Sequence, residues 1–205
     1  MRGRLRFLAS LALFGSAVMA TTLGDPPVAL ASRPREPQQV AASDPQRSVV
    51  LFSPIVTVLK HPRCLNCHTA TDFPRQDDDR HRHIMNVVRG ADGHGAPALR
   101  CNTCHGNANS RAGVPGNPAW ALAPLRMQWE TLSDGEICRS LTDPKRGGMT
   151  FPKLIHHLGE DSLVGWAWDP GVDVTGRPRQ PPPLSREAFI HLVRQWIDTG
   201  AACPG

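Results

Sequence analysis

The sequence predicts a mainly α-helical, loop-rich fold in which short helices pack around a large apolar group other than a side chain. The chain carries 20 Pro and 18 Gly in 205 residues, a content that disfavours long helices and strands. It has few large aromatic side chains from which to build a hydrophobic core, with no Tyr, 6 Phe and 5 Trp. Two pentapeptides of one form, CLNCH at 64–68 and CNTCH at 101–105, mark where such a group would attach.

The N-terminus has the layout of a secretory signal peptide. Three arginines within the first six residues precede the uncharged apolar stretch 7–20, which is too short for a comfortable transmembrane helix. We expect a signal peptide at 1–31, with cleavage after Ala20 as a second possibility and an uncleaved membrane anchor as the alternative. After cleavage we expect a periplasmic chain with no membrane span.

Export changes how the charge and the cysteines are interpreted. The formal net charge of +5 falls to +2 when the three arginines of residues 1–20 are removed. The basic character is therefore weak support for a nucleic-acid partner, and none is expected. In an oxidising compartment, thiols form disulfides or bind cofactors.

The rest of the chain divides into a polar, Pro-containing arm at 32–47 and a single domain at 48–205. An apolar stretch at 48–61 predicts a helix, with Pro54 as a break or kink. Ser133 and Glu136 form a capping box that predicts a helix over 134–141.

Two further helices are expected in the last third. Pro152 near its start favours a short helix over 151–158. Ser185 caps the strongest helical pattern, whose apolar residues share one face, and Gly200 ends it. Residues 165–171 are expected to turn the chain, and 175–184 to form an extended linker.

Three chemistries use a C-x-x-C pair: redox dithiols, zinc sites and covalent haem attachment. Neither pair has the βαβ context of a thioredoxin-like dithiol. A zinc ribbon could use four cysteines, but it gives no reason for a histidine directly after both pairs. Covalent attachment of haem c gives such a reason, because the two thiolates bond to the haem vinyl groups and the histidine directly after them supplies a nitrogen to the iron.

We therefore predict two haem c groups. Cys64 and Cys67 would attach the first, with His68 as its proximal ligand. Cys101 and Cys104 would attach the second, with His105 as its proximal ligand. Arginines are expected to pair with the haem carboxylates, and the candidates are Arg75, Arg80, Arg82, Arg89 and Arg100.

Two cysteines remain outside the motifs, Cys138 and Cys203. Two leftover thiols in an oxidising compartment predict a disulfide that docks the C-terminal helix onto the body. A free Cys138 and an intermolecular bridge through Cys203 are the alternatives.

The far side of each iron needs a second ligand, and histidine and methionine lead to different potentials. Because a histidine just upstream of a motif is badly placed for that motif's haem, His83 or His94 is expected over the haem on His68. Met127, between two tryptophans, or His157, near the apolar edge of its helix, is expected over the haem on His105. The wider set of candidates also holds His81, Met85, Met149 and His156.

Several stretches together resemble one family, the small dihaem cytochrome c-like proteins known as isoquinoline 1-oxidoreductase subunits. The resemblance runs from about residue 48 to the C-terminus and is carried by HPRCLNCH, HIMNVVRGADGHG, RCNTCHG, NPAWALAPLRMQWE, EICRSL, LVGWAWDPG and WIDTGAACP. It implies a dihaem cytochrome c-like fold and electron transfer away from a periplasmic molybdenum hydroxylase. It implies no molybdenum site in this chain.

Three functions fit these expectations. The first is a non-catalytic electron-transfer subunit with two covalent haems and a redox partner protein. The second is a haem enzyme resembling a dihaem peroxidase, which needs one iron with an open position. The third is a module in which one five-coordinate haem binds a gas.

Overall fold

The computed structural model describes residues 43–205, so the expected signal peptide at 1–31 lies outside the described residues. Most of the expected arm at 32–47 also lies outside them. Helix α1 (Pro45–Leu59) begins within that arm, capped by the Asp44 carboxylate, which accepts a hydrogen bond from the Arg47 N–H at 3.0 Å. The expected arm boundary is therefore too late, because an Asp cap followed by Pro is a strong helix start.

Short helices and long connections make up the described chain, as the Pro and Gly content predicts. The α-helices after α1 are α2 (Pro62–Leu65), α3 (Asp134–Thr142), α4 (Phe151–Gly159), α5 (Ser162–Gly165) and α6 (Arg186–Asp198). The 3-10 helices are η1 (Ile84–Asn86), η2 (Cys101–Thr103), η3 (Leu125–Met127) and η4 (Trp166–Trp168). The strands are β1 (Arg75–Gln76), β2 (His81–Arg82), β3 (Gly95–Ala96) and β4 (Leu99–Arg100).

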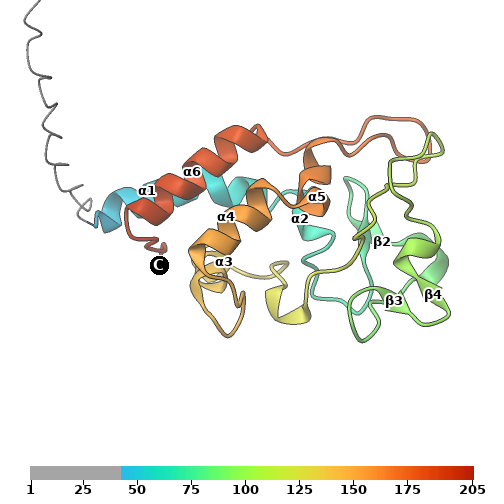
Figure 1. The fold of residues 1–205 in the computed structure, drawn as a ribbon, viewed down its shortest axis with the longest axis horizontal. Helices are drawn as coiled ribbons and strands as arrows, with labels where there is room; N and C mark the ends of the chain where they lie inside the picture. The colour runs from blue at the N-terminus through green and yellow to red at the C-terminus, as the bar shows by residue number, and fades with distance from the viewer. Residues whose placement is uncertain (1–42) are drawn as a thin grey trace, which may run out of the picture. The chain divides into compact units, whose positions relative to one another are not determined.

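The helices gather at one end of this domain and the short strands at the other (Figure 1). Helix α6 lies along α1 and packs on α4, and α1 also contacts α3. Trp196 of α6 is fully buried in this core and meets Phe52 of α1 with ring centroids 5.4 Å apart. The expected disulfide is confirmed: Cys138 of α3 is bonded to Cys203, and it ties the segment after α6 to the helical core.

The expected helices are confirmed, each within a few residues of its predicted ends. Helix α3 begins with the predicted capping box, in which Ser133 and Glu136 hydrogen-bond to each other's backbone N–H. Ser185 caps α6, and Gly200 follows its end at φ +109°, a conformation that glycine adopts without strain. Pro54 does not end α1.

The other end of the domain is built from two antiparallel hairpins, β1–β2 and β3–β4, and from loops. The expected turn at 165–171 instead begins at Gly165, the last residue of α5, and continues into η4. Among the described helices, none combines the length and the apolar character needed to cross a bilayer.

Candidate functional site

Two apolar cavities lie side by side in the domain, and each is lined by one C-x-x-C-H motif. The His105 cavity, about 350 Å³, is lined by Cys101, Cys104 and His105 together with loop residues such as Val88 and Leu99. The His68 cavity, about 320 Å³, is lined by Cys64, Cys67 and His68 together with core leucines such as Leu154 and Leu158. The helical core thus forms one cavity and the hairpin end forms the other.

The backbone folds both motifs in the same way. In the first, α2 leads into a turn in which the N–H groups of Cys67 and His68 donate to the Cys64 carbonyl at 3.2 and 3.0 Å. In the second, η2 gives the same two bonds from Cys104 and His105 to the Cys101 carbonyl, again at 3.2 and 3.0 Å. One helical turn places residues i, i+3 and i+4 on the same side, so both cysteines and the histidine face one cavity.

Each motif histidine is held by a backbone carbonyl at its Nδ1 atom. His68 Nδ1 lies 2.6 Å from the carbonyl oxygen of Met127, and His105 Nδ1 lies 2.8 Å from that of Pro115. A carbonyl only accepts, so each Nδ1 carries the proton and donates it. Nε2 is then the unprotonated nitrogen, which is the form in which imidazole binds a metal.

Each motif histidine also stacks on a tryptophan. The rings of His68 and Trp129 are 3.5 Å apart between centroids and 3° from parallel. Those of His105 and Trp120 are 4.3 Å apart and 6° from parallel. Sequence reasoning treated these two tryptophans as the apolar surroundings of Met127 and missed their contact with the histidines.

Burial makes these histidines neutral at neutral pH. It lowers the pKa of His68 to about 4, with a partial opposing effect from the Met127 carbonyl and a further lowering from His157. It lowers the pKa of His105 to about 4 as well, opposed by the Pro115 carbonyl and helped by His83. Burial also raises the pKa of the Cys64 thiol to about 12 and that of Cys67 to about 11.

A second histidine lines each cavity. His83, directly after β2, lines the His105 cavity, and its ring centroid is 6.0 Å from that of His105 at an interplanar angle of 65°. Its Nδ1 is held by the Ile84 carbonyl at 2.7 Å. His157 of α4 lines the His68 cavity, and its Nδ1 lies 3.2 Å from the Asp161 carboxylate.

The expected pairing of far-side candidates with motifs is corrected by this arrangement. His83 was expected near His68 and lies near His105, because hairpin β1–β2 turns it back and its N–H bonds to the Pro74 carbonyl at 3.0 Å. His157 was expected near His105, but α4 packs in the helical core and brings it to the His68 cavity.

The remaining candidates for the far-side ligands can also be located relative to the two cavities. Met127 lines the His68 cavity, not that of His105, and its carbonyl meets His68 at Nδ1, which is the nitrogen away from a bound metal. His94 has an exposed side chain and lines neither cavity. Met85 lines the His105 cavity and Met149 the His68 cavity, whereas His81 and His156 line neither.

The two cavities share a wall, formed by Arg63, Cys67, Trp120, Ala121, Leu122 and Trp166. Trp120 and Trp166 meet edge to face in it, with ring centroids 4.8 Å apart. The thiol of Cys67 faces both cavities, and the nearby Cys101 helps to raise its pKa after the larger effect of burial. The two motifs therefore lie close together at this shared wall.

Arginines occupy the polar part of the His105 cavity. Of the predicted carboxylate partners, Arg75 and Arg100 line this cavity. Both also pair with carboxylates of the protein, Arg75 with Glu130 at 3.0 Å and Arg100 with Asp92 at 2.9 Å. Arg80 and Arg89 line neither cavity; Arg80 bonds to Glu130 at 2.6 Å and Arg89 to the Thr69 carbonyl at 2.9 Å. Arg82 lies over the Phe73 ring and lines neither cavity.

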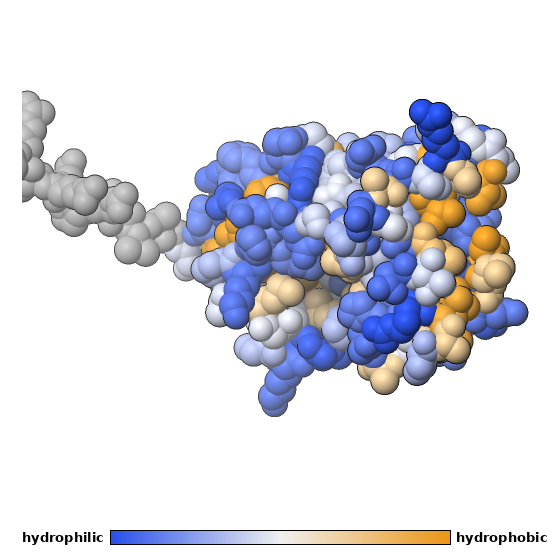
Figure 2. All heavy atoms as spheres, turned by 45° about the vertical axis from the view of Figure 1, so that its right-hand side comes forward, coloured by the Kyte–Doolittle hydropathy of each residue, from blue (hydrophilic) through white to orange (hydrophobic). Residues whose placement is uncertain are grey.

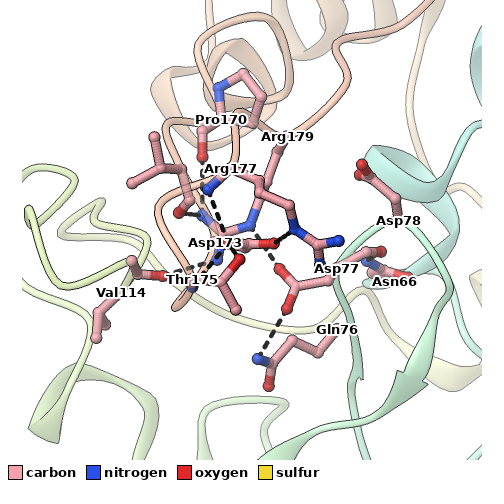
Figure 3. Close-up of polar contacts among 12 residues, drawn as sticks. Asn66, Gln76, Asp77, Asp78, Val114, Pro170, Asp173, Thr175, Arg177 and Arg179 are labelled. Atoms are coloured by element: carbon pink, nitrogen blue, oxygen red, sulfur yellow. Dashed lines mark hydrogen bonds and ion pairs between the residues drawn. The ribbon is translucent and has the colours of Figure 1, made fainter.

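Sequence reasoning missed two arginines in this cavity, Arg63 and Arg179. Arg179 is buried and pairs with Asp77 at 2.6 Å, and it also donates to the carbonyls of Pro170 and Gly113 at 3.2 and 2.7 Å (Figure 3). It fixes the loop around Asp173 against hairpin β1–β2. No pattern in the sequence distinguished these arginines from the surface ones.

Apolar side chains surround the mouth of the His105 cavity. Ile84, Met85 and Val174 line it and are more than half exposed. Figure 2 shows apolar surface gathered on this side of the domain. Within residues 43–205, no three His, Cys, Asp or Glu side chains come together as a group that would hold a metal ion.

No protein-family model matches the chain, and no curated protein or solved structure is significantly similar to it.

Proposed function

We propose that this chain is a periplasmic dihaem c-type cytochrome that carries electrons for a partner oxidoreductase and is not itself an enzyme. The observation that supports this most is a repeated arrangement. Each of two adjoining apolar cavities has a C-x-x-C-H motif, a histidine held at Nδ1 and stacked on tryptophan, and a second histidine.

The residues present fit haem c. An imidazole nitrogen binds a metal at about 2.0 Å, which puts its ring centroid roughly 3 Å from the metal and two opposed rings about 6 Å apart. The separation of His83 and His105 is 6.0 Å. The thiols also favour haem over a zinc ribbon: Cys64 lines one cavity, Cys101 and Cys104 line the other, and Cys67 faces both. A zinc tetrathiolate would need all four sulfurs around one point.

When bound, haem supplies a one-electron couple whose potential the axial ligands and the burial of the site adjust. The protein's part is to hold each ring and to keep other reactants out. His68 and His105 would be the proximal ligands, and the carbonyls of Met127 and Pro115 fix their orientation. His157 and His83 would be the far-side ligands, and the Asp161 carboxylate orients His157.

The second histidine that lines each cavity, His157 or His83, could hold the far side of a bound iron, and this favours electron transfer over the two alternatives. A peroxidase or a gas-binding module needs one open iron position, and each cavity here has an imidazole to fill it. The shared wall that includes Trp120 and Trp166 would keep the two groups close enough for an electron to enter at one and leave at the other.

The resemblance to isoquinoline 1-oxidoreductase subunits points to a periplasmic molybdenum hydroxylase as the partner. The test is anaerobic reduction of the purified dihaem protein by such an enzyme while it oxidises its substrate. Reduction of both haems is expected, and His105→Ala should stop transfer through the second one, whereas His156→Ala, outside both cavities, should not. A wild-type protein that stays oxidised, or that turns over peroxide at enzymatic rates, would contradict the proposal.

A further inference from the structure

Arg63 is the one charged residue in the wall that the two cavities share. It directly precedes Cys64, and its side chain is 1% exposed. It forms an ion pair with Asp78 through Nη2 and lies over the Trp166 ring, 5.9 Å from the ring centroid. Its Nε has no hydrogen-bond partner and is among the few buried side-chain atoms of residues 43–205 without one.

The charge of Arg63 is poorly balanced by the protein. Burial lowers its pKa, and the opposing effect of Asp78 is not enough to restore it. The Asp78 carboxylate is 45% exposed and also accepts from the Gln180 N–H at 3.3 Å. A buried guanidinium with one partly solvated partner and an unused N–H is a site for a second anion.

The neighbouring Arg179 lines the same cavity, but protein groups accept hydrogen bonds from all of its side-chain nitrogens. Its Nε donates to Asp77, and its other nitrogens donate to three backbone carbonyls, including that of Gly113. Figure 3 shows Arg179 enclosed by these partners. Arg179 can therefore support the loop, while Arg63 has donors left for a ligand.

We propose that Arg63 binds a carboxylate of the haem in the His105 cavity and that its charge, shared by both cavities, sets the two haem potentials together. This inference rests on the proposed function. The choice of haem follows from chemistry: thioether bonds form at one edge of the ring and the carboxylates lie at the opposite edge. Arg63 directly precedes Cys64, which attaches the first haem, whereas the polar side chains of Asp77 and Arg179 that act on its charge line the His105 cavity alone. The carboxylate edge of a haem belongs beside such polar groups, so the second haem provides the carboxylate.

The test compares three variants of the holoprotein: Arg63→Gln, Arg63→Lys and Arg80→Gln. Arg80 is a matched control, because its Nε is also buried without a partner and it pairs with a carboxylate, but it lines neither cavity. The haem count by intact mass, both midpoint potentials, and the resonance Raman bending band of the haem carboxylates are measured for each.

In Arg63→Gln, loss of a buried positive charge disfavours the more negative, reduced state. Both midpoint potentials should therefore fall. For the His105 haem, the equilibrium constant for reduction should fall about tenfold, which corresponds to about 59 mV for one electron. The carboxylate band should shift. Arg63→Lys should keep both potentials near the wild-type values, because lysine keeps the positive charge. It should still shift the carboxylate band, because lysine lacks the planar guanidinium that donates two parallel hydrogen bonds. Arg80→Gln should change neither.

Two haems with unchanged potentials and an unchanged band in Arg63→Gln would overturn this inference and leave the proposed function intact. A fall in only one potential would overturn the shared effect. If Arg63→Gln attaches no haem, Arg63→Lys decides: an unshifted carboxylate band in it overturns the inference. A wild-type protein without haem would instead contradict the proposed function.

Discussion

The imidazole of His68 lies flat against the indole of Trp129, with ring centroids 3.5 Å apart. The same two residues are joined through the backbone, where the Trp129 N–H donates to the His68 carbonyl at 2.9 Å. The indole N–H in turn donates to the Ser140 hydroxyl of α3 at 3.0 Å. Trp129 therefore links the orientation of His68 to the helical core.

Replacing Trp129 with Leu should reduce the free energy of unfolding by about 2–4 kcal/mol, because a buried aromatic ring and its hydrogen bond are lost. It should also broaden or shift the Soret band of the haem on His68. Urea unfolding and the optical spectrum measure the two effects. Trp120→Leu, at a less buried ring, should affect the His105 site with a smaller loss of stability. A Trp129→Leu loss below about 1 kcal/mol would contradict this role.

Replacing His83 with Ala should leave one of the two proposed haems high-spin, because among residues 43–205 His83 is the only other histidine that lines the His105 cavity. His94→Ala is the control, since His94 lies in the same stretch of chain and lines neither cavity. EPR spectra of the oxidised proteins distinguish the spin states. Low-spin spectra for both haems in His83→Ala would rule out His83 as the ligand and direct attention to Met85.

His157→Ala should have the same effect on the other haem. Its neighbour His156 offers a close control, because it lies on the same helix, pairs with Glu160 on the surface and lines neither cavity. Combining His83→Ala with His157→Ala should leave both haems high-spin. A double variant that keeps one low-spin haem would show that another residue, such as Met85 or Met149, is a ligand.

The helices could be predicted because their signals are local. The capping box at Ser133 and Glu136, the Ser185 cap and the apolar face of α6 each depend on residues within a few positions of one another. The start of α1 was missed because Asp44 and Pro45 lie in a stretch whose polar composition suggested an arm.

The two C-x-x-C-H motifs could be recognised in the sequence because each is short and local, whereas the second histidines could not be paired with their motifs. Whether His83 faces His68 or His105 depends on hairpin β1–β2, which is two residues long in each strand and has weak sequence signals. The positions of Trp120, Trp129 and Arg63 depend on contacts between segments far apart in the chain. Residue periodicity gives no information on such contacts.

Glu130 supports the loop after the first motif, and its effect should depend on pH. Burial alone would raise its pKa, but hydrogen bonds from Ala70 and Thr69 and the charges of Arg75 and Arg80 hold the pKa below its ordinary value. A carboxyl group with a lowered pKa in the folded state stabilises the protein above its unfolded-state pKa of about 4.5 and loses this effect as the pH falls further.

Glu130→Gln should therefore lower the free energy of unfolding by about 2 kcal/mol near pH 7, and by less as the pH falls below about 4.5. Urea unfolding of both proteins across this range gives the difference. Glu160→Gln, at an exposed carboxylate directly after α4, should cost less than about 0.5 kcal/mol. A Glu130→Gln cost that is the same at every pH would show that the charge of Glu130 does not matter.

Each C-x-x-C-H motif should carry one covalent haem, which the intact mass of the mature protein would reveal. The protein is expressed with a cytochrome maturation system and compared with a variant in which Cys101 and Cys104 are both Ala. Two haem increments are expected in the wild type and one in the variant. A wild-type mass with a zinc adduct, or with one haem or none, would contradict it.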